Sequence, residues 1–187
     1  MTIPHARILA RESSALLLID LQEAYRGKLE REESLLRANQ NLLRAAVRLA
    51  LPVIVTEQYP KGLGRTWSEL VQHLSPTAMH FEKTTFSCLG AAGLPEHLKA
   101  LGRRQIVVGG IETHVCVSQT VHDLLATGYM ACVVRDAVSS RHALDDEVGF
   151  QKMLGSGAVP TTVEQVLLEW LRDSRASEFK EIQQLIR

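Results

Sequence analysis

The sequence predicts an α/β fold, in which a mostly parallel sheet of about six strands lies between two layers of helices as a three-layer α/β/α sandwich. Short, continuous apolar runs, typical of parallel strands buried on both faces, alternate along the chain with segments whose apolar residues recur at helical spacing. The 187 residues, of which 45% are hydrophobic, suit one domain over 1–187.

The first half of the chain contains three of the expected strands. The first is the run ALLLID, which ends in the carboxylate of Asp20, and the third ends near Lys83. Glycine and proline mark the loop that follows the second strand. The expected elements are a strand over 15–20, a crossover helix over 35–47, a strand over 52–56, a loop over 57–66, a short helix over 67–74 and a strand over 79–83.

The second half centres on residues 104–126, where the pattern changes from strand to helix. A β-branched run over 106–108 ends at Gly109 and Gly110, and Cys116 follows at the first turn of an amphipathic helix. This alternation indicates a doubly wound, Rossmann-like sheet. The remaining expected elements are a helix over 93–101, the helix from Cys116 to Gly128, a strand over 129–135 with Asp136 at its exit, a helix that ends at Leu154, a strand over 158–161, a helix over 162–171 and a tail helix over 178–187.

Charge and composition narrow the class of partner. The 21 basic and 21 acidic side chains balance, so nothing points to a nucleic acid or an anionic membrane, and a small molecule is the expected ligand. The apolar run over 15–19 is too short for a signal peptide or a membrane span, which predicts a cytoplasmic protein. Three cysteines without paired spacing fit free thiols in a reducing compartment. No strand is followed by a complete G-x-G-x-x-G turn, which argues against a dinucleotide-binding dehydrogenase.

Three reactive side chains fall at the exits of different strands: Asp20, Lys83 and Cys116. The carboxyl ends of parallel strands share one edge of a sheet, so these residues are expected to meet there. A carboxylate can accept the thiol proton, a lysine can stabilise both charges, and the start of a helix favours a thiolate. Taken singly, each residue has an ordinary alternative as a core cysteine, a helix cap or a surface charge.

Three motifs resemble the isochorismatase-like cysteine hydrolase superfamily, which includes nicotinamidases and N-carbamoylsarcosine amidohydrolase. They are ALLLIDLQ around Asp20, FEKTTFSC around Lys83 and GGIETHVCVSQTVHDLLATGY around Cys116, within a resemblance that runs over about 14–169. Within the third motif, the residues GIETHVCV look closest to the uncharacterised isochorismatase-domain branch. The resemblance implies an Asp–Lys–Cys triad in which Asp20 takes the thiol proton, Cys116 attacks a carbonyl carbon and Lys83 holds the charges in place.

The same resemblance implies a non-proline cis peptide bond between Ile111 and Glu112, just before the turn that carries the nucleophile. Such a bond would turn backbone N–H groups toward the site. We expect the N–H of Cys116 and that of a residue close to the bond, Glu112 or Val115, to form the oxyanion hole.

Departures from the family pattern separate its branches. Nicotinamidases that bind a metal carry an Asp-x-His pair after the second strand, where this chain has Glu57, Gln58 and Tyr59. We therefore expect no catalytic metal and no cofactor, and nicotinamide is disfavoured as substrate. Isochorismatases proper hydrolyse a vinyl ether without a cysteine nucleophile, so Cys116 argues against that reaction.

Other positions are weaker candidates, for which packing or helix capping is an equal alternative. Cys88 and Cys132 are expected in the core, Cys132 because it lies inside a strand run. The candidates for the substrate pocket are Gln22, Tyr25, Tyr59, Leu63, Phe86 and Thr113.

The preferred hypothesis is hydrolysis of a small amide or related C–N bond through a thioester on Cys116, without metal or cofactor. A redox or thiol-sensing protein is a second hypothesis, because an activated cysteine serves either role. A non-catalytic scaffold is a third, although such a chain would be expected to lose a member of the triad. The resemblance and the apolar tail helix also predict a homo-oligomer.

Overall fold

The sheet has six strands, all parallel, in the order β3-β2-β1-β4-β5-β6. The computed structural model describes residues 5–186, and the C-terminal residue of the predicted tail helix, at position 187, lies outside them. The expected α/β/α sandwich is confirmed, with a sheet that is wholly rather than mostly parallel. The strands are β1 (Ser14–Ile19), β2 (Val53–Gln58), β3 (Met79–Lys83), β4 (Gln105–Ile111), β5 (Met130–Ser139) and β6 (Val159–Thr161).

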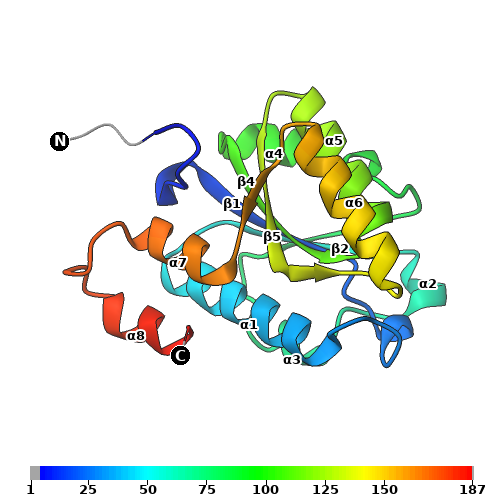
Figure 1. Cartoon of the computed structure of the whole chain (residues 1–187), viewed down its shortest axis with the longest axis horizontal. Helices are drawn as coiled ribbons and strands as arrows, with labels where there is room; N and C mark the ends of the chain where they lie inside the picture. The colour runs from blue at the N-terminus through cyan, green and yellow to red at the C-terminus, as the bar shows by residue number, and fades with distance from the viewer. Residues whose placement is uncertain (1–4, 187) are drawn as a thin grey trace.

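Helices cover both faces of the sheet (Figure 1). Alternate residues of β1 face opposite layers: Leu16 and Leu18 pack in the core cluster shared with α1 and α7, whereas Leu17 and Ile19 pack in the cluster shared with α4, α5 and α6. The helices are α1 (Glu32–Arg48), α2 (Pro60–Leu63), α3 (Ser68–Val71), α4 (Leu94–Leu101), α5 (Ser118–Ala126), α6 (Ala143–Gly155), α7 (Val163–Leu171) and α8 (Phe179–Gln184).

The strand order places a topological switch between β1 and β4. From β1 the chain moves outward through β2 and β3, then returns to pair β4 with the other side of β1 and continues outward to β6. In open α/β sheets, the crevice outside the carboxyl ends of the strands at such a switch is where ligands bind. The residues that follow β1 and β4 therefore occupy the functional edge.

Strands β4 and β5 are longer than the sequence predicts. Gly109 and Gly110 lie within β4 rather than ending it, and β5 continues through Asp136, which is inside the strand rather than at its exit. A Cβ on Gly110 would lie 2.1 Å from the carbonyl oxygen of Ile19, so only glycine allows this close approach to β1. The register of the pairing between β4 and β5 shifts between Val108 and Gly110, where the apolar run of β5 ends.

The tail helix α8 packs on its own chain. Ile182 is fully buried in the cluster that contains α1 and α7, and Glu181 pairs with Arg48 of α1 at 2.6 Å. The apolar face of the tail helix is therefore buried against its own chain. Within residues 5–186, no helix combines the length and the hydropathy that a membrane span requires.

Candidate active site

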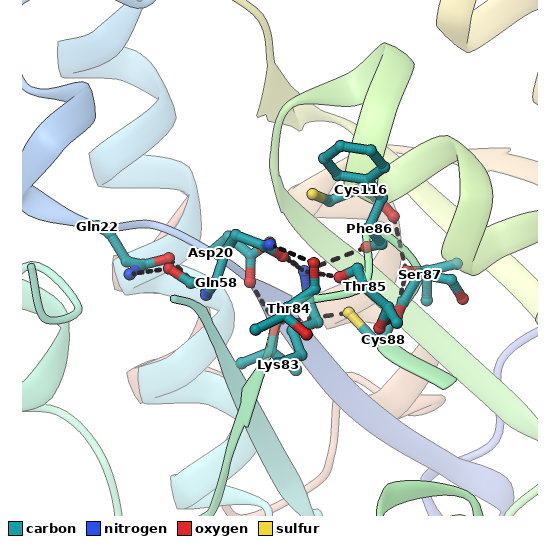
Figure 2. Close-up of polar contacts among 12 residues, drawn as sticks. Asp20, Gln22, Gln58, Lys83, Thr84, Thr85, Phe86, Ser87, Cys88 and Cys116 are labelled. Atoms are coloured by element: carbon teal, nitrogen blue, oxygen red, sulfur yellow. Dashed lines mark hydrogen bonds and ion pairs between the residues drawn. The ribbon is translucent and has the colours of Figure 1, made fainter. Parts of the chain in front are cut away.

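The centre of the site is a buried ion pair between Asp20 and Lys83 (Figure 2). Asp20 follows the last residue of β1 in a left-handed conformation, with φ +54°, and Lys83 is the last residue of β3. The ammonium Nζ of Lys83 lies 2.6 Å from Oδ2 of Asp20, and both side chains are at most 2% exposed. Oδ1 of Asp20 accepts a hydrogen bond from the Thr56 hydroxyl at 2.7 Å. Each carboxylate oxygen thus has a fixed donor.

The ammonium of Lys83 has further acceptors around it. Its Nζ lies 2.7 Å from Oε1 of Gln58 and 3.1 Å from the carbonyl oxygen of Phe86. Burial opposes the charged form, but the charge of Asp20 and its hydrogen bond to the ammonium outweigh it and raise the pKa of Lys83 above its usual value. Lys83 therefore remains a cation beside Asp20.

Gln22 and Gln58 connect the ends of β1 and β2. The side chain of Gln22 donates to the carbonyl oxygens of Gln58 and Gly64 at 3.0 and 2.7 Å and accepts from the Gln58 N–H at 2.7 Å. Gln22 is fully buried, so it holds the loop after β2 and does not line a pocket, contrary to the sequence prediction. Gln58 and Thr56, which orient the ion pair, were not predicted as site residues; their position at the end of β2 was the available signal.

Cys116 lies in a π-helical turn, Thr113–Val117, between β4 and α5. The N–H groups of Val115 and Val117 both donate to the carbonyl oxygen of Glu112, at 3.0 and 3.2 Å, which winds this turn and puts Cys116 at the carboxyl edge of the sheet. The Cys116 carbonyl accepts from the Thr120 hydroxyl at 2.6 Å. Cys116 therefore lies just before helix α5, and not inside its first turn as the sequence predicts.

The thiol of Cys116 is held in its neutral form. Burial raises its pKa most, the charge of Asp20 raises it further, and the charge of Lys83 lowers it only in part. The expectation that the helix start would favour a resting thiolate is therefore wrong for the free site. The charge of Asp20 acts on the thiol, so this carboxylate is the candidate proton acceptor.

Backbone groups near Cys116 differ in their availability. The Ile111–Glu112 peptide bond is cis. Val115 is a poor oxyanion-hole candidate, because its N–H already donates to Glu112. Within residues 5–186, the N–H of Glu112 has no protein acceptor. Of the two alternatives that the sequence left open, Glu112 is the better donor.

The buried carboxylate of Asp146 fixes the position of the turn that carries Cys116. Asp146 of α6 accepts from the Thr113 hydroxyl at 2.6 Å, from Arg135 at 2.7 Å and from Arg31 at 3.1 Å. Thr113 is fully buried and points into this network, so it does not line a pocket as predicted. Asp146 was not predicted, because a charged residue inside a helix reads as a solvent-exposed one in the sequence.

The predicted pocket residues differ in their exposure. Tyr25 is half-buried, and Leu63, the last residue of α2, is partly buried. Tyr59 and Phe86 are each 54% exposed, and the Phe86 carbonyl binds Lys83. A cavity of about 400 Å³ at the end of β3, which neither Asp20 nor Cys116 lines, is lined by Tyr59, Pro60, Lys61, Glu82, Lys83, Thr84, Gly90 and Ala92.

Cys88 lies closer to the site than the sequence predicts. It is fully buried, as expected of a core residue, but its Sγ is 3.5 Å from the same Thr56 hydroxyl that binds Asp20. Burial raises the pKa of Cys88 to about 11, with a further contribution from Asp20. Cys132 is also buried, which raises its pKa to about 12.

The side chains of Glu57 and Gln58, where metal-binding nicotinamidases carry their Asp-x-His pair, bind other groups of the protein. Glu57 accepts from Arg65 at 2.8 Å and from the Thr66 N–H at 2.7 Å, and Gln58 binds Lys83. Among the residues that the structure describes, no group of three or more His, Cys, Asp or Glu side chains is arranged to hold a metal ion. Glu57 thus shapes the loop after β2.

The fold and the site define an α/β protein with an acid, an ammonium and a thiol at the carboxyl edge of its sheet. The Isochorismatase domain family matches residues 14–165. The chain belongs to this family, and its fold is that of an isochorismatase-family hydrolase.

Relatives and solved structures agree with this assignment. The chain is 41% identical over 172 residues to isochorismatase domain-containing protein 1 of Salmo salar, covering 90% of this chain. It spans only 59% and 62% of the length of that protein and of its Danio rerio counterpart. A secreted isochorismatase effector of Phytophthora sojae is 37% identical over 192 residues, covering 99% of this chain and 86% of that protein.

Two solved structures illustrate the range of the fold. The MAR1 ribonuclease from Caenorhabditis elegans is 39% identical, with a TM-score of 0.90 over 95% of this chain and 91% of that one. YcaC from Escherichia coli, an octameric hydrolase of unknown specificity, is 24% identical with a TM-score of 0.90 over 99% and 91% of the two chains. The second likeness concerns the fold alone.

Proposed function

We propose that the protein hydrolyses a small amide or a related C–N bond through a thioester on Cys116, with Asp20 and Lys83 completing a catalytic triad and without a metal or cofactor. The observation that carries this proposal is the buried Asp20 carboxylate, which is paired with the Lys83 ammonium and bonded to the Thr56 hydroxyl, and whose charge acts on the Cys116 thiol. A nucleophile, its base and the group that orients the base are the components of covalent acyl transfer.

The first half of the reaction forms the acyl-enzyme. Asp20 takes the thiol proton as the sulfur of Cys116 attacks the carbonyl carbon, and the carbonyl oxygen becomes an oxyanion that accepts from the N–H groups of Cys116 and Glu112. When this intermediate collapses, the C–N bond breaks and Asp20 gives its proton to the leaving amine. The product of this half is a thioester on Cys116.

The second half releases the acyl group. Asp20, again a carboxylate, takes a proton from water, whose oxygen attacks the thioester carbon. The C–S bond breaks, and the proton returns to the sulfur from Asp20. Lys83 keeps Asp20 in place through both halves and offsets the charge that passes between the carboxylate and the sulfur.

The competing hypotheses fit these observations less well. A thiol sensor needs an exposed cysteine with a lowered pKa, whereas Cys116 is buried and its pKa is raised. Vinyl ether hydrolysis gives the thiol no role. RNA cleavage is a second candidate because of the likeness to the MAR1 ribonuclease, although the formal net charge of zero offers little attraction for a polyanion.

The test is a screen of the purified protein against small amides, ureas and carbamoyl compounds, with an RNA oligomer as a further substrate. We expect amide turnover, and mass spectrometry of the quenched reaction should find the acyl adduct on Cys116. Cys116→Ala should abolish both, whereas the control Cys132→Ala should retain them. RNA cleavage that survives in Cys116→Ala would contradict the proposal, and so would an adduct on another residue.

We also propose that copies of the chain associate through α6. Leu144 and Val148, four residues apart on that helix, are 75% and 58% exposed, and they form an apolar patch on one side of it. The octamer of YcaC gives the fold a precedent for self-association. Light scattering after size-exclusion chromatography should give an oligomer for the native chain and a smaller species for Val148→Glu. The control Val71→Glu, at another exposed valine, should leave the mass unchanged; a native monomer would contradict the proposal.

We propose the cytoplasm as the place of action. Cys88, Cys116 and Cys132 are free thiols, which is the state that a reducing compartment maintains. Because a relative from Phytophthora sojae is secreted, location varies among relatives, and fractionation of cells that express the full-length protein is the direct test.

A further inference from the structure

Thr120 of α5 joins the turn that carries Cys116 to the loop that follows β3. Its hydroxyl donates to the carbonyl oxygen of Cys116 at 2.6 Å and accepts from the backbone N–H of Cys88 at 2.9 Å. Cys116 is four residues away along the chain, whereas Cys88 is 32 residues away. Thr120 is fully buried, so solvent does not compete for either hydrogen bond. One hydroxyl therefore connects two segments that are distant in the sequence.

Of these two hydrogen bonds, only the one to Cys116 is an ordinary helical feature. Threonine hydroxyls commonly donate to the carbonyl oxygen four residues back. Thr127 of the same region does so too, to the carbonyl oxygen of Asp123 at 2.7 Å. The bond from Cys88 differs, because in the described chain, 5–186, Thr120 supplies the only acceptor for that backbone N–H. It therefore fixes how the loop after β3 sits against α5.

The side chain of Cys88 extends this connection to the acid of the site. Its Sγ lies 3.5 Å from the Thr56 hydroxyl, which in turn donates to Oδ1 of Asp20 at 2.7 Å. Cys88 thus contacts Thr120 through its backbone and Thr56 through its sulfur. From the carboxylate of Asp20 to the carbonyl oxygen of Cys116, each consecutive pair of groups is in contact.

The loop 84–87, between Lys83 and Cys88, also contacts the ammonium group of the site (Figure 2). Two of its backbone carbonyl oxygens lie 3.3 and 3.1 Å from Nζ of Lys83. At the end of this loop, the hydroxyl of Ser87 donates to Oδ2 of Asp123 on α5, at 2.5 Å. Helix α5, which follows the nucleophile, therefore holds the lysine's loop as well.

We propose that Thr120 is a positioning residue, whose hydroxyl fixes the distance between Cys116 and the pair of Asp20 and Lys83. This inference rests on the proposed hydrolase function and adds to the triad a residue on which the reaction depends. The three reactive groups come from separate segments, and a misplacement of about 1 Å is enough to slow a reaction by about 100-fold. Because Thr120 is fully buried, it acts through the backbones of Cys88 and Cys116 rather than on the substrate.

The first test replaces Thr120 by valine, which has nearly the same shape but neither a donor nor an acceptor. For an amide that the native protein turns over, we expect kcat to fall by about 10- to 100-fold and KM to change by less than about threefold, because alignment rather than binding is lost. Thr120→Ser keeps the hydroxyl and should recover most of the rate. The matched control Thr127→Val removes only a local helical bond and should leave kcat unchanged. Native kcat in Thr120→Val, or equal losses in Thr120→Val and Thr120→Ser, would overturn the proposal.

The second test is a double-mutant cycle that needs no turnover. Iodoacetamide labelling of Cys116 at pH 8 is compared in the native protein, Asp20→Asn, Thr120→Val and the double variant, each shown by urea unfolding to be folded. Asp20→Asn should speed labelling, because the charge of Asp20 raises the pKa of the thiol. If Thr120 sets the distance between the two groups, this acceleration should be at least about threefold smaller in the Thr120→Val background. Thr127→Val should leave it unchanged. Equal accelerations with and without Thr120 would assign it a merely structural role and overturn the proposal.

The positioning role and the hydrolase function fail in different ways. Labelling reports on the geometry around Cys116 whether or not the protein hydrolyses an amide. A protein that turns over no amide, but in which Thr120→Val still weakens the effect of Asp20→Asn, would refute the hydrolase and retain the positioning role. Amide turnover at the native kcat in Thr120→Val would retain the hydrolase and overturn the positioning role.

Discussion

Asp20 has two opposite effects on the chemistry of Cys116. Its negative charge raises the pKa of the thiol in the free protein, yet in the proposed reaction it is also the group that takes the proton during attack. Lys83 acts in the other direction, because its positive charge lowers the pKa of the thiol. In the free protein, the sulfur of Cys116 therefore stays protonated.

This arrangement predicts that Asp20→Asn makes Cys116 easier to alkylate. Removing the carboxylate charge leaves Lys83 as the nearby charge, so the thiol pKa falls and the thiolate fraction near pH 8 rises. Amide turnover should fall by at least about 10³-fold, because the base is lost. The rate of iodoacetamide labelling against pH, read at Cys116 by mass spectrometry, checks the first effect. The control is Asp173→Asn, at an exposed site; slower labelling in Asp20→Asn would contradict this account.

At single residues, the sequence predicts reactive groups better than their partners. Asp20, Lys83 and Cys116 are found because each ends a strand or begins a turn at the same sheet edge. Thr56 and Gln58 act through hydrogen bonds whose partners are distant in the chain, so only their position at the end of β2 marks them. The pKa of Cys116 was mispredicted for the same reason, since it depends on burial and on Asp20.

Among the elements, α6 controls the position of the nucleophile's turn. The helix lies so close to the turn Thr113–Val117 that a Cβ on Gly149 would lie 2.6 Å from the Cα of His114, a backbone atom of that turn. Asp146 of the same helix holds Thr113 in that turn. A single helix therefore supports the segment that carries Cys116 through both steric fit and a hydrogen bond.

We expect Gly149→Ala to displace this turn. The added methyl group meets backbone rather than a flexible side chain, so the free energy of unfolding should fall by about 1–3 kcal/mol and kcat by about 10- to 100-fold. Urea unfolding and steady-state kinetics measure the two effects. Gly155→Ala is the matched control in the same helix, because a Cβ there meets nothing within 4 Å. It should be neutral or stabilising by up to about 1 kcal/mol.

Element boundaries were predicted well where local sequence sets them and poorly where tertiary pairing does. Strand β1 and helix α7 were found within a residue of their ends, since an apolar run and a helical stripe define them. Strand β5 was cut short at Arg135, because the polar pair Arg135 and Asp136 resembles a loop. Those two side chains are stabilised inside the fold, Arg135 by Asp146 and Asp136 by the N–H of Val163.

For the whole molecule, buried thiols predict a loss of stability in alkali. The pKa of Cys88 is raised to about 11 and that of Cys132 to about 12, and that of Cys116 is raised as well. In the unfolded chain each thiol ionises near its usual value of about 8.5, so above that pH the unfolded state binds fewer protons than the native state. The free energy of unfolding therefore falls as pH rises from about 8.5 toward the native pKa values.

The slope gives a quantitative check. Each raised thiol contributes up to about 1.4 kcal/mol per pH unit to this decline. Urea unfolding between pH 8 and 11 should show the fall, and Cys132→Ala should reduce its slope by one thiol's share while lowering stability at neutral pH through the cavity. An identical slope in the variant would mean that Cys132 does not titrate on unfolding.

The pairing of Ser14 in β1 with Gln105 in β4 has a consequence for biosynthesis. Strand β1 emerges from the ribosome first, yet one of its two neighbours is translated only after β2, β3 and α4. Until then its apolar edge has open backbone groups, the kind of edge that pairs promiscuously with other nascent chains. Fragments that stop before Gln105 should therefore aggregate and depend on chaperones, and none of them contains Cys116.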